Sequence, residues 1–521
     1  MNARRKSLLF LIGLSVALAG PVQATTGRFA DGTPQPEEIT KDPRTNFLYG
    51  SIGGENEAGL PYWIAVVLPR IFPEYLPGPG GYASLGLPWE EGQEFPSGFS
   101  KKKVLIQRVG FNCALCHSTQ YRTAADETPV VVAAGGSNTA DIQGLLEFFS
   151  KSANDPRFNA NTILAEIDGA YPLRWYNRLL YRFVLIPITR KRLREQGEDF
   201  AWTASRPRWG PGRDAPMNLT KFSLLEMPED GSVDHTDFPA IWHLAAREQA
   251  GRTWSDGTPR PIPAHTMLMN LDGATTSFRS VVIDSALGLG ARNTPFFRAR
   301  IPNLLEWLRE FRPPAYPLPV DAGKAARGQT VYEAECAACH TSGRDNRMGT
   351  VIPIEEVGTD RERLDTWTLA AANGANKRVA SLGIQRTPMV KTQGYIGVQL
   401  DGIWLRGPYL HNGSVPTLRA LLTPVAERPR AFCRGWDVLD QENVGFISDG
   451  RIDPRCDEPG PPAKPSPWDK PGGPGWSNEW PQPRVWKYYV AERGNGNSGH
   501  EYGVRLSAED KDALLEYLKT L

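Results

Sequence analysis

The feature that most constrains the fold of this chain is a pattern of two cysteines and a histidine that occurs twice. The pattern C-x-x-C-H occupies residues 113–117 in "FNCALCHST" and residues 336–340 in "ECAACHTSG". At this spacing two thiols can add across the two vinyl groups of a haem, and the adjacent histidine then binds the iron from below. The predicted attachment residues and axial ligands are Cys113, Cys116 and His117 for one haem and Cys336, Cys339 and His340 for the other.

Two other uses of paired cysteines fit the pattern less well. A redox-active dithiol has no need of a histidine at the same position in both copies. A four-cysteine zinc site usually brings its two pairs within about 20 residues of each other, whereas here a whole domain separates the pairs. The sequence therefore predicts two covalently bound haem c groups.

The N-terminus has the pattern of a secretory signal peptide. Three basic residues, Arg4, Arg5 and Lys6, precede an apolar run over residues 8–20, and "VQA" at 22–24 is typical of a cleavage site. The run is shorter than the roughly 20 residues that span a bilayer, and an uncleaved N-terminal anchor is the alternative. We predict a signal peptide at residues 1–24 and a periplasmic or secreted protein that is not an integral membrane protein.

The overall charge of the chain argues against a nucleic-acid partner. Its 59 basic and 58 acidic side chains give a formal net charge of +1, which offers no excess of positive charge for a polyanion.

Cys433 and Cys456 lie outside the two repeated patterns. In an exported chain, a disulfide between them is the expected state. Such a bond would close a loop in a region with little apolar periodicity, and two free thiols are the alternative.

The positions of the haem motifs suggest the domain organisation. Residues 25–105 are rich in Gly, Pro and aromatic residues, which predicts an arm draped over another domain. An N-terminal haem domain follows at about 106–315, with helices expected near 140–152 and 296–311. Residues 312–321, "RPPAYPLPVD", form a proline-rich linker.

A second haem domain is predicted at 322–521. It is expected to begin with a helix capped by Asp321 and to end with one whose capping box is Ser507 and Asp510. An irregular Pro/Gly-rich insertion is expected at 425–495. The predicted fold class is mainly α with long irregular loops, comprising two cytochrome c-like haem domains, the arm and the insertion.

The segment "LRGPYLHNGSVPTLRALL", residues 405–422, is similar to the Pro-Tyr-x-His-Asp-Gly-Ser stretch of bacterial dihaem cytochrome c peroxidases. The chain resembles the rubber-oxygenase-like branch of that superfamily more broadly, in both haem motifs, in "TDFPAIWH" and in "GNGNSGHEYG". The resemblance implies an oxidoreductase that uses oxygen or peroxide and acts on an organic substrate or a redox protein. It also implies a calcium ion between the domains.

The second axial ligand of the C-terminal iron is assigned from this resemblance. Peroxidases of the family have a methionine after the "HNGS" segment, but the last methionine here is Met389. The rubber oxygenases instead have a histidine near the C-terminus, and His500 stands in the matching place. His500 is therefore the predicted ligand, and His411 is the competing one.

The N-terminal iron has no obvious second ligand, because no histidine lies between His117 and His235. The rubber oxygenases have a phenylalanine over this iron, which makes Phe238 the candidate for the distal wall and Phe222 a further pocket residue. The tryptophan expected beside Phe222 is Ser223, which puts rubber cleavage itself in doubt. Ligation by His235 or His243 is the alternative.

Two functions remain open from the sequence. In the first, an oxidoreductase, the N-terminal haem binds oxygen or peroxide and the C-terminal haem, with two histidine ligands, transfers or stores electrons. In the second, a dihaem cytochrome carries electrons without a substrate of its own. The haem that lacks an obvious second ligand favours the enzyme.

Overall fold

The computed structural model describes residues 42–243, 270–342, 346–461 and 485–521. The predicted signal peptide, His265 and most of the least regular part of the insertion lie outside these residues. Within the described ranges the chain is mainly helical with long irregular loops, as the sequence predicts. No helix in those ranges is both long and apolar enough to cross a membrane.

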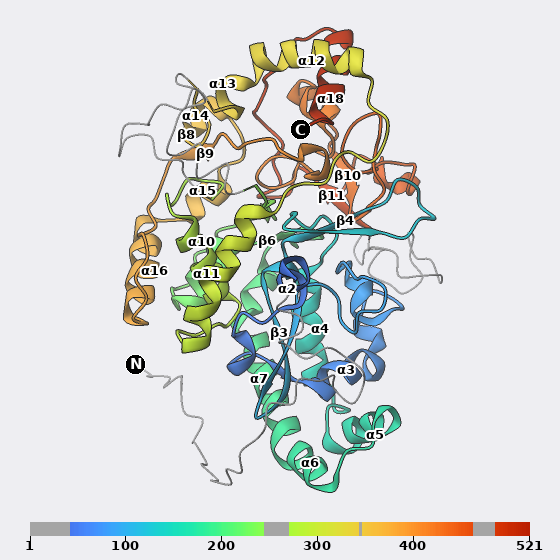
Figure 1. The fold of residues 1–521 in the computed structure, drawn as a ribbon, viewed down its shortest axis with the longest axis vertical. Helices are drawn as coiled ribbons and strands as arrows, with labels where there is room; N and C mark the ends of the chain where they lie inside the picture. The colour runs from blue at the N-terminus through green and yellow to red at the C-terminus, as the bar shows by residue number, and fades with distance from the viewer. Residues whose placement is uncertain (1–41, 244–269, 343–345, 462–484) are drawn as a thin grey trace.

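The helices are distributed along the whole chain (Figure 1). The α-helices are α2 (Pro43–Tyr49), α3 (Tyr62–Ile71), α4 (Ile142–Asn154), α5 (Ala160–Ala170), α6 (Trp175–Leu180), α7 (Ile186–Asp199), α8 (Pro216–Asn218), α10 (Phe278–Gly288), α11 (Pro295–Glu310), α12 (Ala322–Glu335), α13 (Ala337–His340), α14 (Ile354–Val357), α15 (Glu362–Thr366), α16 (Leu369–Ser381), α17 (Leu418–Leu421) and α18 (Ala508–Leu518). Two π-helical segments, η5 (Tyr181–Leu185) and η7 (Leu219–Leu224), and several 3-10 turns accompany them.

The strands are short and form small antiparallel sheets. The sheets are β1 (Leu60–Pro61) with β3 (Ile106–Phe111) and β2 (Phe99–Val104), β4 (Ser118–Tyr121) with β5 (Val130–Ala133), β6 (Arg213–Asp214) with β7 (Thr236–Asp237), β8 (Val351–Pro353) with β9 (Gly394–Ile396), and β10 (Ala431–Arg434) with β11 (Trp486–Tyr489).

The arm packs into the N-terminal half of the molecule rather than forming a core of its own. Buried side chains of α3, such as Ile64 and Leu68, share one apolar cluster with Phe148 of α4 and Ile163 of α5. The arm also contains two helices, α2 and α3, which the sequence analysis did not predict because this region is rich in Pro and Gly.

The predicted pair of terminal helices in the C-terminal domain is present. Asp321 caps α12 by accepting from the Lys324 amide, and Ser507 caps α18 by accepting from the Asp510 amide. The two helices pack together at the top of Figure 1. Gly328 of α12 allows this close contact, because a Cβ there would lie 1.9 Å from the Ala513 carbonyl oxygen.

The insertion contains the antiparallel strand pair β10–β11 and a disulfide. Cys433 and Cys456 are bonded, which confirms the expected pairing. Both cysteines are buried, together with Val485. The bond closes a loop within the insertion and restricts the conformations of that loop.

Candidate haem-binding sites

The first C-x-x-C-H motif lies between the β2–β3 hairpin and β4. Asn112 begins the 3-10 turn η4 (Cys113–Leu115) by accepting from the Ala114 amide at 2.9 Å. Its side-chain amide donates to the carbonyls of Leu48 and Gly50, at 3.3 and 2.9 Å. The end of α2 in the arm therefore fixes the conformation of the motif.

The imidazole of His117 is held in an orientation that suits an iron ligand. Its Nδ1 lies 2.8 Å from the Pro239 carbonyl oxygen, an acceptor that selects the tautomer protonated at Nδ1. Burial lowers the pKa of His117 to about 4. The ring is thus neutral near pH 7, and its Nε2 has a lone pair for a metal.

The second motif repeats this arrangement with different elements. His340 ends the short helix α13, directly after α12. Its Nδ1 lies 2.7 Å from the Val398 carbonyl oxygen, just beyond β9. Burial lowers the pKa of His340 as well. In both sites a carbonyl from a remote segment orients the histidine, as expected of a metal ligand.

His500 lies close to His340. The centroids of the two rings are 6.1 Å apart, and the Nδ1 of His500 is buried without a hydrogen-bond partner. Two imidazoles that bind one metal from opposite faces, each through a nitrogen at about 2.0–2.1 Å, have centroids about 6 Å apart. The separation of the two rings therefore agrees with the predicted pair of ligands, His340 and His500.

The backbone holds His500 in this position. Gly499 has φ +72°, and a Cβ there would lie 2.3 Å from the Gly358 carbonyl carbon. The His500 amide donates to the Val357 carbonyl at 2.7 Å. Only glycine allows so close a contact between this loop and α14. Burial lowers the pKa of His500 to about 4, which keeps the ring neutral.

His411, the competing ligand, makes different contacts. Its ring stacks on Tyr395 with centroids 4.3 Å apart, and its carbonyl accepts from the Asp237 amide at 2.8 Å. Burial lowers its pKa to about 3. These contacts favour a packing role between the two halves of the chain.

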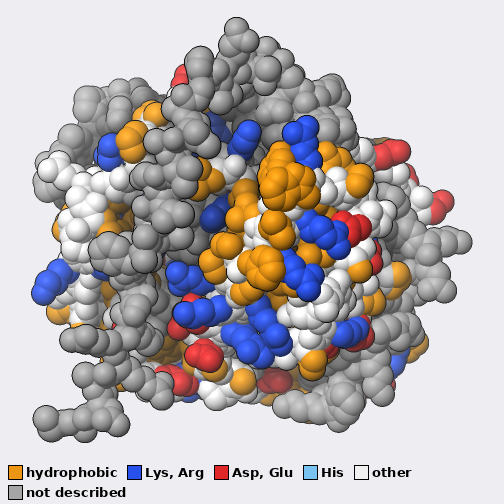
Figure 2. Space-filling view, turned by 90° about the horizontal axis from the view of Figure 1, so that it is seen from below, with side chains coloured by type: hydrophobic (Ala, Val, Ile, Leu, Met, Phe, Trp, Pro, Cys, Tyr) orange, Lys and Arg blue, Asp and Glu red, His pale blue; other side chains and the backbone are white. Residues whose placement is uncertain are grey.

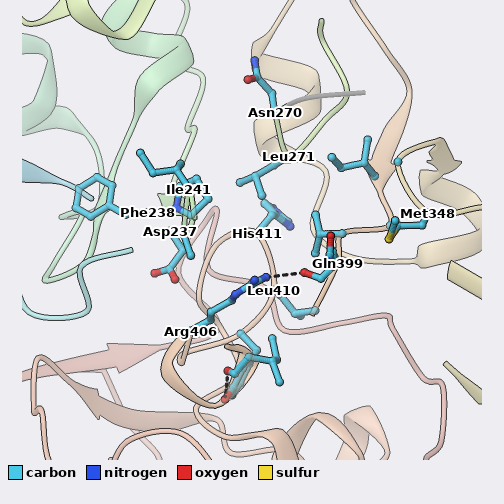
Figure 3. Close-up of a pocket in the computed structure, with 18 of the residues that line it drawn as sticks. Asp237, Phe238, Ile241, Asn270, Leu271, Met348, Gln399, Arg406, Leu410 and His411 are labelled. Carbon is cyan, nitrogen blue, oxygen red and sulfur yellow. Dashed lines mark hydrogen bonds between the residues drawn. The ribbon is translucent and has the colours of Figure 1, made fainter. Parts of the chain in front are cut away.

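A cavity of about 230 Å³ lies between the two histidine-orienting segments (Figure 3). Pro239 and Val398, the acceptors for His117 and His340, both line it. Arg406 also lines it and donates to the Gln399 carbonyl and the Asp401 carboxylate, at 2.7 and 2.8 Å. The Arg406 Nε is buried without a partner, so the guanidinium keeps one further N–H to donate.

Trp242 links the same two segments. It is fully buried, lies three residues after Pro239 and donates from Nε1 to the Asp401 carbonyl at 3.0 Å. The Arg406 guanidinium lies 5.7 Å from the centre of its ring. An aromatic side chain thus bridges the segments that orient His117 and His340.

The candidate distal residues lie in separate places. Phe238 is buried at the edge of the cavity, where its ring points away from His411 (Figure 3). It precedes Pro239, whose carbonyl is on the Nδ1 side of His117. Phe222 instead packs on Trp202 at 5.3 Å between ring centroids. Their roles over the first iron stay predictions.

The alternative ligands for the first iron also have other partners. Both ring nitrogens of His235 have hydrogen-bond partners, the Asn495 side chain at 2.9 Å and the Pro207 carbonyl at 3.1 Å. The His243 Nδ1 lies 3.5 Å from the Asp401 carboxylate. His235 therefore has no ring nitrogen left for a metal.

Buried ion pairs fix the first site against the insertion. Arg122, next to the end of β4, pairs with Asp437 at 2.5 Å, and both side chains are almost fully buried. Arg434 of β10 pairs with Asp237 of β7 and donates to the Gly413 carbonyl at 2.8 Å. The C-terminal insertion thus forms part of the wall around the N-terminal site.

The implied calcium ion has no support in the described ranges. No group of three or more His, Cys, Asp or Glu side chains there is arranged to hold a metal ion.

Comparison with known families identifies a c-type cytochrome segment. Residues 394–433 match the family described as "RoxA-like, cytochrome c-like". The match begins at β9, includes Val398 and His411 and ends at Cys433. A domain of this kind implies a covalently bound haem c. The two C-x-x-C-H motifs lie outside the matched residues, and their spacing agrees with covalent attachment of haem c.

Two curated proteins of Sinorhizobium fredii are similar to the chain. One, the uncharacterised protein y4iM, is 31% identical over 282 residues, which are 47% of this chain and 58% of that protein. The other, the uncharacterised protein y4iJ, is 28% identical over 277 residues, 40% of this chain and 41% of that protein. The chain thus spans about half the length of the relatives it matches.

Sequence reasoning missed the residues that connect the sites. Pro239, Val398, Arg406 and Trp242 are remote from both haem motifs in sequence. Trp242 and Pro239 lie in "TDFPAIWH", a segment that also carries the family resemblance. The resemblance assigned a role to Phe238 in this segment but none to Pro239 or Trp242.

Proposed function

We propose that this protein is an exported dihaem c-type cytochrome that acts as an oxidoreductase. Its N-terminal haem, held by Cys113, Cys116 and His117, binds oxygen or peroxide. Its C-terminal haem, held by Cys336 and Cys339 and ligated by His340 and His500, transfers or stores electrons. When bound, the haems supply the redox chemistry.

The observation that carries the proposal is the contrast between the two histidines of the motifs. His340 has a second imidazole 6.1 Å from its own. For His117, the nearest histidines in the sequence after it are His235 and His243, and each has other partners. One iron with two histidines and one with a single histidine are the arrangement expected of an enzyme that binds a small oxidant.

The residues of the chain prepare the site in two ways. The Pro239 and Val398 carbonyls hold the Nδ1 protons of His117 and His340, so that each Nε2 remains available. Trp242 joins the two segments by its hydrogen bond to the Asp401 carbonyl and places a buried aromatic ring beside the cavity's Arg406.

An electron-transfer cytochrome without its own substrate is the second candidate. His411 favours it, because this buried histidine lines the same cavity as Pro239, whose carbonyl orients His117.

Carbon monoxide binding to the reduced holoprotein separates the two functions. We expect one of two haems to shift its absorption spectrum, together with one high-spin and one low-spin signal in the electron paramagnetic resonance spectrum of the oxidised protein. Two low-spin haems and no spectral shift with carbon monoxide or cyanide would establish the electron carrier instead.

A further inference from the structure

The helical segment from α6 through η5 to α7 has two apolar faces. Tyr181, Ile186, Thr189 and Leu193 are buried on the inner face, which packs against α4 and α5. The outer face carries large apolar side chains that no described residue covers. An amphipathic helix on a protein surface normally has only one apolar face.

The outer apolar face is extensive. Trp175 is 73% exposed, Phe183 68%, Ile188 49% and Leu179 47%. They recur at positions 175, 179, 183 and 188, and Tyr176 and Val184 lie beside them, also exposed. The π-helical turn η5 includes Phe183 and Val184 and joins α6 to α7 within this segment. We call these six side chains the apolar stripe.

Basic side chains lie among and beside the apolar stripe, and three of them, Arg178, Lys191 and Arg192, pair with Asp168 or Glu195. Residues 171–194 contain seven basic residues and no acidic ones, in a chain whose overall formal charge is only +1. The basic residues are Arg174, Arg178, Arg182, Arg190, Lys191, Arg192 and Arg194. Figure 2 views the lower end of the molecule in Figure 1, and it shows an apolar patch with Lys and Arg side chains around it.

We propose that this face docks on an anionic phospholipid surface. Trp and Tyr side chains favour the interface between lipid and water, and Leu, Ile and Phe side chains would insert among the acyl chains. Arginine and lysine can lie along the apolar surface and extend their charges to the lipid phosphates. A protein partner would need a matching acidic and apolar surface, whereas anionic lipid provides both features at once.

The charge distribution favours lipid over a second copy of the chain. In a symmetric dimer the same patch would face itself, which would bring two sets of basic residues together. The apolar stripe would be covered, but the surrounding positive charges would repel each other.

Vesicle sedimentation with the full holoprotein tests the proposal. We expect binding to vesicles of phosphatidylcholine with phosphatidylglycerol, little binding to phosphatidylcholine alone, and weaker binding at high salt. The double variant Trp175→Ser and Phe183→Ser should bind about tenfold more weakly or worse, because it removes the two most exposed apolar side chains of the stripe. The triple variant Arg182→Gln, Lys191→Gln and Arg192→Gln should lose the preference for anionic vesicles.

Leu369→Ser is the matched control, since Leu369 is an exposed apolar residue of α16, 64% exposed and remote from the stripe in sequence. It should bind vesicles as the unaltered protein does. Haem absorbance and thermal melting check that each variant is folded. Equal binding by the stripe variant and the control would overturn the proposal. A second outcome would also overturn it: the unaltered protein does not sediment with vesicles but forms a concentration-dependent dimer, and the stripe variant abolishes that dimer.

Discussion

The two C-x-x-C-H motifs have the same five-residue pattern but different surroundings. The first follows a β-hairpin, is fixed by α2 of the arm and is walled by residues of the C-terminal insertion. The second lies at the end of one of two packed terminal helices, with His500 held close by a glycine loop. In the proposed function, the same attachment chemistry therefore serves two roles, because the surrounding segments decide which second ligand reaches each iron.

Loss of haem attachment should give the largest effect. Cys113→Ala with Cys116→Ala should remove one haem, and Cys336→Ala with Cys339→Ala should remove the other, because each pair holds its own haem through thioether bonds. Mass spectrometry of the mature protein should show two haems in the unaltered chain and one in each variant. A single haem in the unaltered chain, or zinc in place of haem, would contradict the comparison.

The second ligand should distinguish the motifs spectroscopically. His500→Ala should leave both haems attached and convert one low-spin signal to high-spin, since it removes the imidazole 6.1 Å from His340. Electron paramagnetic resonance measures the change. His411→Ala is the control and should leave the spin states as they are. If the two variants behave the other way round, His411 is the ligand.

The buried ion pair near the first motif should contribute more to the stability of the protein than the exposed pair near the second. Asp437→Ala leaves Arg122 buried beside the first motif without its carboxylate, which should lower the free energy of unfolding by about 3–5 kcal/mol. Arg327→Ala breaks the exposed pair with Asp510 between α12 and α18 and should cost about 1 kcal/mol or less. Denaturant unfolding measures both. If the two variants lose equal amounts of unfolding free energy, the buried pair between the first site and the insertion contributes no more than the exposed pair.

The pH dependence of stability should carry the signature of His235. Burial is the main cause that lowers its pKa to about 3, from an ordinary value of 6.5. The unfolded chain therefore binds a proton below about pH 6.5 that the folded chain does not, so stability falls as the pH falls through that window, by about 1.4 kcal/mol per pH unit. Unfolding between pH 7 and 5 should show a smaller slope in His235→Asn. An unchanged slope would assign the dependence to other groups.

Local sequence determined the parts of this protein whose chemistry depends on neighbours along the chain. The caps of α12 and α18 and the disulfide between Cys433 and Cys456 could be predicted, because each cap joins residues three positions apart and these two cysteines alone lie outside the C-x-x-C-H motifs. The arm was harder, since its helices α2 and α3 gain their stability from a core shared with α4 and α5.

Only the tertiary structure decided how the sites are completed. The carbonyls of Pro239 and Val398 and the bridge made by Trp242 join residues more than 50 positions apart. Backbone carbonyls leave no mark in the sequence, because every residue has one. The path of the chain therefore decides which carbonyl orients each histidine, and the amino-acid pattern shows only that a histidine is there to be oriented.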